Sequence, residues 1–115
     1  MPNPRRIERL QQLILETAAT TVQRDLADPR LGFVTVTHVR LAPDLSFATV
    51  YWSCLGTDAQ QRTCDRALQS ARTRIQSAIA GALGTRVTPQ IRLAFDETLA
   101  KAAHLEEIFH RLRAE

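Results

Sequence analysis

Apolar residues at the start of the chain recur with the spacing of one helix face. They follow steps of three and four residues, at Ile7, Leu10, Ile14, Ala18 and Val22. Asn3 is suited to cap such a helix and Pro4 to occupy its first position. The pattern predicts a helix from Pro4 to about Leu26, ended by the turn residues Asp28, Pro29, Arg30 and Gly32.

The next two segments are rich in β-branched and aromatic residues, which favour strands. They cover residues 33–41 and 46–55, and Ala42, Pro43 and Asp44 between them predict a hairpin turn. In the second segment, alternation places Ala48, Val50, Trp52 and Cys54 on one face and Phe47, Thr49, Tyr51 and Ser53 on the other. Neither face is plainly polar, so we expect helices to cover one face and the other to serve for contact.

The helical spacing returns in the second half of the chain. Thr57 and Gln60 have capping-box spacing, and an apolar stripe then runs to about Leu83, where Gly84 predicts the helix end. Residues 91–95 alternate as a third strand, and a last helix is predicted from about Glu97 to Arg111.

This order of elements predicts an α+β fold, a three-stranded sheet with helices packed on one face. The long helical connection can return the third strand parallel to the second. We expect one domain over residues 1–97 and a C-terminal helical tail over 98–115. The chain has 115 residues, of which 44% are hydrophobic and 23% charged, as in folded soluble proteins. Apolar runs are too short to span a membrane and no secretory signal is present, so a cytoplasmic location is expected.

Positive charge is concentrated in one part of the chain. Residues 62–92 hold six arginines and one aspartate, whereas the whole chain has a net charge of +3. Arg62, Arg66 and Arg74 are related by helical steps of four and eight residues. Such a face can be an ordinary solvated surface, but with Asp65 as its single acid it is better suited to attract phosphate.

Signatures of an enzyme are missing from the sequence. There is no nucleophile elbow and no phosphate-binding glycine loop with its lysine. Glu106 or Glu107 with His110 has ligand spacing but is more typical of a solvated charge cluster, so no metal or cofactor is expected. Cys54 and Cys64 are predicted to be free thiols that pack as small apolar residues, with a redox switch as the alternative.

Two motifs that nucleic-acid-binding domains use are present in weak form. Residues 81–84 read GxxG, the loop of KH domains, but the space before the third strand leaves no room for a second helix, so Gly84 is interpreted as a helix end. Trp52 and Tyr51 are aromatic strand residues of the kind that stack on bases. Core packing is favoured for Trp52, whereas Tyr51 is equally suited to a buried and to a solvent-exposed position.

Taken in order, the sequence resembles the ribosome-binding factor A family. The resemblance begins in the arginine-rich first helix and continues through Asp28-Pro29-Arg30 and the following strand segment. It includes Pro43-Asp44-Leu45, Ala48, Val50 and Tyr51, and resumes at Ala67, Leu68, Ala71, Arg86, Pro89, Ile91 and Asp96.

The resemblance implies a type II KH-like fold in which a kink between two helices replaces the GxxG loop. That kink falls at Ala71, Arg72 and Thr73, with Thr73 where relatives carry glycine. It also implies a non-enzymatic assembly factor that binds free 30S subunits and 16S rRNA, supports processing of the 16S rRNA 5′ end, and matters most during growth in the cold. A ribosome-associated GTPase is implied as a partner in release, and we expect a monomer that does not bind membranes.

We expect phosphate contacts to come from arginines of the first helix and of the kinked helix pair. The predicted RNA-binding residues are Arg5, Arg6, Arg9, Arg62, Arg66, Arg72, Arg74 and Arg86. The alternative is a protein-interaction module that docks through the sheet face or through the tail stripe of Leu105, Ile108, Phe109 and Leu112.

Overall fold

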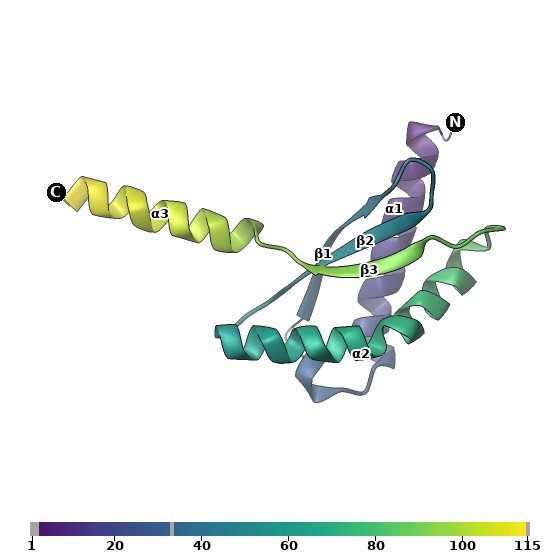
Figure 1. Ribbon diagram of the computed structural model, residues 1–115, viewed down its shortest axis with the longest axis horizontal. Coiled ribbons are helices and arrows are strands. Elements are labelled where there is room, and N and C mark those ends of the chain that lie inside the picture. Colours follow the sequence, from purple (N-terminus) through teal and green to yellow (C-terminus); the bar gives the residue numbers. More distant parts are fainter. Residues whose placement is uncertain (1–2, 33, 115) are drawn as a thin grey trace.

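A computed structural model describes residues 3–32 and 34–114, with side chains described at all of these except 25, 99–104 and 114. The chain runs through α1 (Pro4–Thr20), the π-helical turn η1 (Thr21–Asp25), the 3-10 turn η2 (Pro29–Leu31), β1 (Val34–Leu41) and β2 (Phe47–Cys54). It continues through α2 (Asp58–Leu83), β3 (Gln90–Phe95) and α3 (Thr98–Ala114). The predicted order of helices and strands is confirmed (Figure 1).

Both long helices of the domain begin at the predicted caps. The Asn3 side chain accepts a hydrogen bond of 2.9 Å from the Arg5 amide, with Pro4 at the first helical position. At α2, Thr57 and Gln60 form the reciprocal capping box, with bonds of 2.7 and 3.2 Å. Gly84 ends α2 in the left-handed conformation at φ 60°, which glycine adopts without a steric penalty.

The end of the first helix departs from a regular α-helix. We expected helix to about Leu26, but the last turn, η1, is π-helical before Leu26 becomes extended. Threonine hydroxyls contribute to this departure, since Thr21 Oγ1 donates a hydrogen bond to the Thr17 carbonyl at 2.8 Å. Local bonds of this kind compete with the regular helical ladder.

The sheet has the order β1-β2-β3, with β1 antiparallel and β3 parallel to β2. The register of β1 shifts between Val36 and His38, so that Thr37 forms a β-bulge. Before the bulge Val34 and Val36 pair with Cys54 and Trp52, and after it His38 pairs with Tyr51. Strict alternation would have placed His38 on the same side as Val36, and the bulge moves it to the opposite face.

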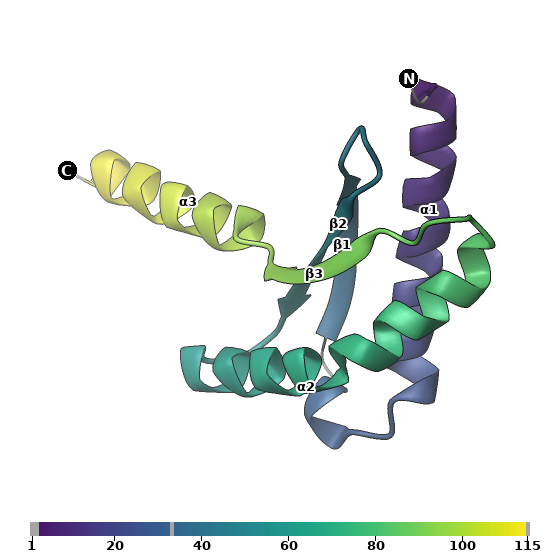
Figure 2. The same cartoon turned by 45° about the vertical axis from the view of Figure 1, so that its right-hand side comes forward.

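The α2 helix connects β2 to β3 and returns the chain parallel to β2, as predicted. It is one helix of 26 residues, and its axis changes direction along its course in both views (Figures 1 and 2). The family resemblance implies a kink between two helices at Ala71, Arg72 and Thr73. The structure has a bent helix without a break, and the placement of the bend at these three residues stays a prediction.

The core lies between one face of the sheet and the helices α1 and α2, which pack on that side and against each other (Figure 2). Its largest fully buried side chains are Trp52, Ile14, Leu68, Ile75, Ile79, Ile91, Val34 and Val50. Each buried aliphatic side chain of this size contributes about 1.5–3 kcal/mol to folding. Core packing of Trp52, favoured from the sequence, is confirmed, and its ring meets Phe95 edge-on at 5.2 Å between centroids.

Asp96 joins the sheet to α3, which extends away from the rest of the molecule (Figure 1). Its carboxylate accepts bonds from the Thr98 amide at 2.9 Å and from Thr37 Oγ1 at 2.7 Å, and His38 Nδ1 lies 3.3 Å away. Hydrogen bonds from Thr98 and then Thr37, together with the charge of His38, hold the Asp96 pKa far below its usual range. Within the described part of the chain, no helix is long and apolar enough to cross a membrane.

Replacing Gln76 by alanine is expected to lower the free energy of unfolding by about 1–3 kcal/mol, because two backbone groups lose their partner. The Gln76 amide donates to the Pro89 carbonyl at 2.8 Å and accepts from the Ile91 amide at 2.7 Å, joining α2 to the outer edge of β3. Urea unfolding followed by circular dichroism measures the change. Ser77→Ala, on the exposed neighbour, is the control, and equal stability of the two variants would contradict this role for Gln76.

Candidate nucleic-acid interface

The solvent side of α2 presents two arginines on successive turns. Arg62 and Arg66 are four residues apart and exposed, whereas Cys64, Ala67 and Leu68 point into the core. We call Arg62 and Arg66 the helix arginine pair. Burial of the apolar stripe of α2 therefore fixes the direction in which this pair points.

The charge of the helix arginine pair is not neutralised by any carboxylate of the described residues. Arg66 contacts the hydroxyl of Thr63 at 3.5 Å, and the neighbouring Asp65 accepts a bond from Gln69 at 3.2 Å. Arg30 shows the opposite case, since it binds Asp28 at 2.7 Å and holds the pKa of that carboxyl below its ordinary value. The helix arginine pair therefore projects positive potential into solvent.

The other predicted arginines of α2 lie on its flanks. At about 100° per residue, Arg74 is turned about 80° away from Arg66. It lines a hollow together with Leu26, Asp28 and Pro29, on the side of the helix that faces η2. Arg72 is half-buried and falls on the opposite flank, which Gln76 places against β3. The structure thus brings Arg62 and Arg66 together and places Arg72 and Arg74 on different sides.

The remaining predicted residues lie at the other end of the domain. Arg5, Arg6 and Arg9 are exposed on the first turns of α1, and Arg86 is exposed in the loop after α2. In both views the end of α2 and this loop run beside α1, while the start of α2 lies on the other side of the molecule (Figures 1 and 2). A helix of 26 residues is about 39 Å long, so contacts with all these arginines require an extended partner.

Two exposed arginines outside the predicted set lie on the sheet. Arg40 on β1 and Arg92 on β3 both flank Thr49 of β2 in the observed register, so they share the face that α1 and α2 leave uncovered. Strand alternation in the sequence was sufficient to place Arg92 on the face of β3 opposite Ile91 and Leu93. The bulge at Thr37 is needed to place His38 and Arg40 on the face opposite Val34 and Val36, and no local pattern in the sequence indicates that bulge.

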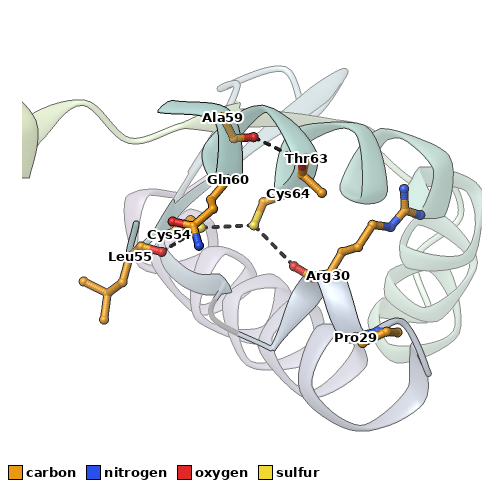
Figure 3. A pocket seen from close by; sticks show the side chains of 8 residues that line it. All are labelled: Pro29, Arg30, Cys54, Leu55, Ala59, Gln60, Thr63 and Cys64. Atoms are coloured by element: carbon orange, nitrogen blue, oxygen red, sulfur yellow. Dashed lines mark hydrogen bonds between the residues drawn. The ribbon is translucent and has the colours of Figure 1, made fainter. Parts of the chain in front are cut away.

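A separate hollow of about 290 Å³ lies between η2, the end of β2 and the start of α2 (Figure 3). The sulfur atoms of Cys54 and Cys64 approach to 3.0 Å at its wall, and Cys64 Sγ also lies 3.3 Å from the Arg30 carbonyl. Both thiols are free, as predicted; Cys64 is buried, but Cys54 is only half-buried. Burial, followed by the contact with Cys54, raises the pKa of Cys64 to about 11.

Comparison with known proteins gives one consistent family. A model of the family described as ribosome-binding factor A matches residues 6–109. The chain is 42% identical over 108 residues to a ribosome-binding factor A from Frankia casuarinae, an alignment that covers 94% of this chain. The chain spans 64% of that relative's length.

Solved structures agree with the sequence comparison. The crystal structure of ribosome-binding factor A from Thermus thermophilus aligns with a TM-score of 0.68 at 29% identity, over 77% of this chain and 93% of that one. A homology model of the Thermus thermophilus factor, fitted into a cryo-electron microscopy map of its complex with the 30S subunit, aligns with a TM-score of 0.62 at 30% identity. That alignment covers 76% of this chain and 92% of the other.

Iodoacetamide at pH 8 is expected to alkylate Cys54 well before Cys64, because the thiolate is the reactive form and a pKa of about 11 leaves about a thousandth of Cys64 ionised. Peptide mass spectrometry of the folded chain over time measures the two rates. Cys54→Ser is the control, in which Cys64 should remain slow because its burial is retained. Equal rates at the two positions in the folded protein would contradict this expectation.

Proposed function

The chain belongs to the ribosome-binding factor A family, and on that premise we propose that it is a ribosome assembly factor that binds free 30S subunits through 16S rRNA. It supports late maturation of the subunit, including processing of the 16S rRNA 5′ end, and this role matters most in the cold. It works in the cytoplasm as a monomer, by binding rather than by catalysis, without a cofactor, and a ribosome-associated GTPase assists its release.

The observation that carries this proposal is the helix arginine pair. Guanidinium groups form paired, charge-assisted hydrogen bonds with phosphate oxygens, and those of the pair are not already occupied by a carboxylate of the described chain. A folded RNA offers phosphates at regular intervals on a rigid surface. Binding releases counterions from that RNA, so affinity depends strongly on salt concentration.

The other predicted arginines lie on other sides of the domain and fit an extended RNA that reaches beyond the helix arginine pair. Arg74 on one flank, Arg72 on the other, Arg86 after the helix and Arg5, Arg6 and Arg9 on α1 extend the basic surface beyond the helix arginine pair. The similarity to the Thermus thermophilus factor fitted into a map of its 30S complex supports the choice of partner.

A second candidate is docking of a protein on α3. One stripe of this helix carries large apolar side chains that are 37–63% exposed, at Leu105, Ile108, Phe109 and Leu112. Contacts of this kind survive moderate salt and ribonuclease treatment, whereas phosphate contacts do not. The two modes are compatible in one protein because they use different elements.

The double variant Arg62→Gln/Arg66→Gln is expected to bind purified 30S subunits more weakly while keeping its fold. Each lost phosphate contact should also reduce the slope of log affinity against log salt by about 0.7 to 0.9. Co-sedimentation at several salt concentrations measures both effects. The matched control is Arg111→Gln/Arg113→Gln, which removes the same charge from α3.

The same variants test the role in maturation. In bacteria depleted of their own factor, the unaltered chain and the α3 control are expected to restore mature 16S rRNA 5′ ends in the cold, and the Arg62→Gln/Arg66→Gln chain is not. Primer extension measures the fraction of 16S rRNA that has the mature 5′ end. Full 30S affinity of the α2 variant, or an equal loss in the control, would contradict the proposed contacts.

A further inference from the structure

The face of the sheet that points away from α1 and α2 has an ordered arrangement of flat and charged side chains. Cross-strand partners share a face, and the register places Arg40, Thr49 and Arg92 in one row across the three strands. His38 and Tyr51 form the adjacent row, and Phe47 lies on the other side of the arginine row. The outer sheet face is defined here as His38, Arg40, Phe47, Thr49, Tyr51 and Arg92.

Two stacked pairs cover this surface. The His38 and Tyr51 rings lie 4.2 Å apart with an angle of 12° between their planes, and the Arg92 guanidinium lies 4.1 Å from the centre of the Phe47 ring. The His38 side chain is 48% exposed, and Arg92 is exposed as well. Each pair therefore presents one flat, nitrogen-containing group to solvent, the His38 ring in the first pair and the Arg92 guanidinium in the second.

The charge of the outer sheet face is positive. Arg40 and Arg92 are exposed, and none of the six residues that define the face is acidic. The carboxylate of Asp96, just after β3, lies 3.3 Å from His38 Nδ1 at one edge of the face, where it also accepts bonds from Thr37 and Thr98 and is 11% exposed. The face thus attracts anions over its centre.

These properties distinguish the outer sheet face from a typical protein-docking surface. In the described part of the chain, the exposed large apolar side chains are Leu55, Val87, Leu105, Ile108, Phe109 and Leu112, and all of them lie elsewhere. Flat groups beside arginines are instead suited to nucleic-acid bases and their phosphates. Bases reach such a platform only when they are unpaired, because a duplex keeps its bases stacked inside.

We propose that the outer sheet face binds a short single-stranded RNA segment, stacking bases on His38 and Arg92 and pairing a phosphate with Arg40. The three strands are about 4.8 Å apart, so the face is about 10 Å wide between its outer strands, which leaves space for two or three bases. The inference rests on the proposed function for the choice of RNA as the polymer. It adds a second contact surface, on the side of the sheet opposite α1 and α2.

The proposal is tested by fluorescence anisotropy of the full chain with two labelled probes. One is an oligouridine of about ten nucleotides, and the other is a blunt RNA duplex of about 16 base pairs. His38→Ala and Arg40→Gln/Arg92→Gln are each expected to lower affinity for the single strand about fivefold or more, the loss expected for one base stack. Affinity for the duplex should change by much less.

Control variants separate stacking from charge and from loss of fold. His38→Phe keeps a flat ring and is expected to retain binding of the single strand. Arg111→Gln/Arg113→Gln removes two charges from α3 and is expected to leave the affinity for the single strand unchanged. Thermal unfolding by circular dichroism verifies that each variant is folded.

Three results would overturn the proposal. The first is unchanged oligouridine affinity in both His38→Ala and Arg40→Gln/Arg92→Gln. The second is an equal loss of affinity for the duplex. The third is that these variants lose only the part of 30S binding that survives ribonuclease treatment, which would indicate a protein partner. The proposed function fails separately, if the unaltered chain binds oligouridine but not 30S subunits.

Discussion

The burial of a single face of the sheet determines where the arginines of α2 and of the strands point. Ala48, Val50 and Trp52 of β2 are fully buried against the core, and α1 and α2 supply the apolar stripes that cover them. Because the same burial orients α2, its polar side must face solvent and carries Arg62 and Arg66. Because only one face of the sheet is covered, the alternating residues of β1, β2 and β3 form a second open surface.

The two surfaces differ in the form of nucleic acid that they fit. The helix arginine pair lies on the exposed side of α2, and the other predicted arginines lie on its flanks, in the loop after it and on α1, where guanidinium groups can reach phosphates of a folded RNA. The outer sheet face combines fewer charges with stacked rings, an arrangement that favours unpaired bases. A domain with both surfaces is suited to an RNA that contains folded and unpaired segments together.

Local signals in the sequence were sufficient for most of the fold. Asn3, the Thr57–Gln60 capping box and Gly84 predicted where helices begin and end, because caps are satisfied by residues close in sequence. The long connection predicted the parallel pairing of β3 with β2, which the register confirms. The family resemblance implied a kink at residues 71–73, and α2 is bent along its course but unbroken, since nothing in these residues removes a backbone donor as proline would. The placement of the bend at these residues stays a prediction.

Features that depend on several elements could not be predicted in this way. The bulge at Thr37 follows from the pairing of β1 with β2 and from the bond between Thr37 and Asp96, 59 residues apart. It brings His38 beside Tyr51, whose environment the sequence left open. Likewise, Arg74 was expected beside Arg66, but its place next to η2 depends on how α2 packs against the chain before β1.

The central claim is that exposed guanidinium groups of α2 contact the RNA of the small subunit. Its most direct test is modification of arginines by phenylglyoxal in the free protein and in its complex with purified 30S subunits, with each site quantified by mass spectrometry. Arg62 and Arg66 should lose their reactivity in the complex, while Arg111 and Arg113 keep theirs. Full reactivity of Arg62 and Arg66 in the saturated complex would contradict the account.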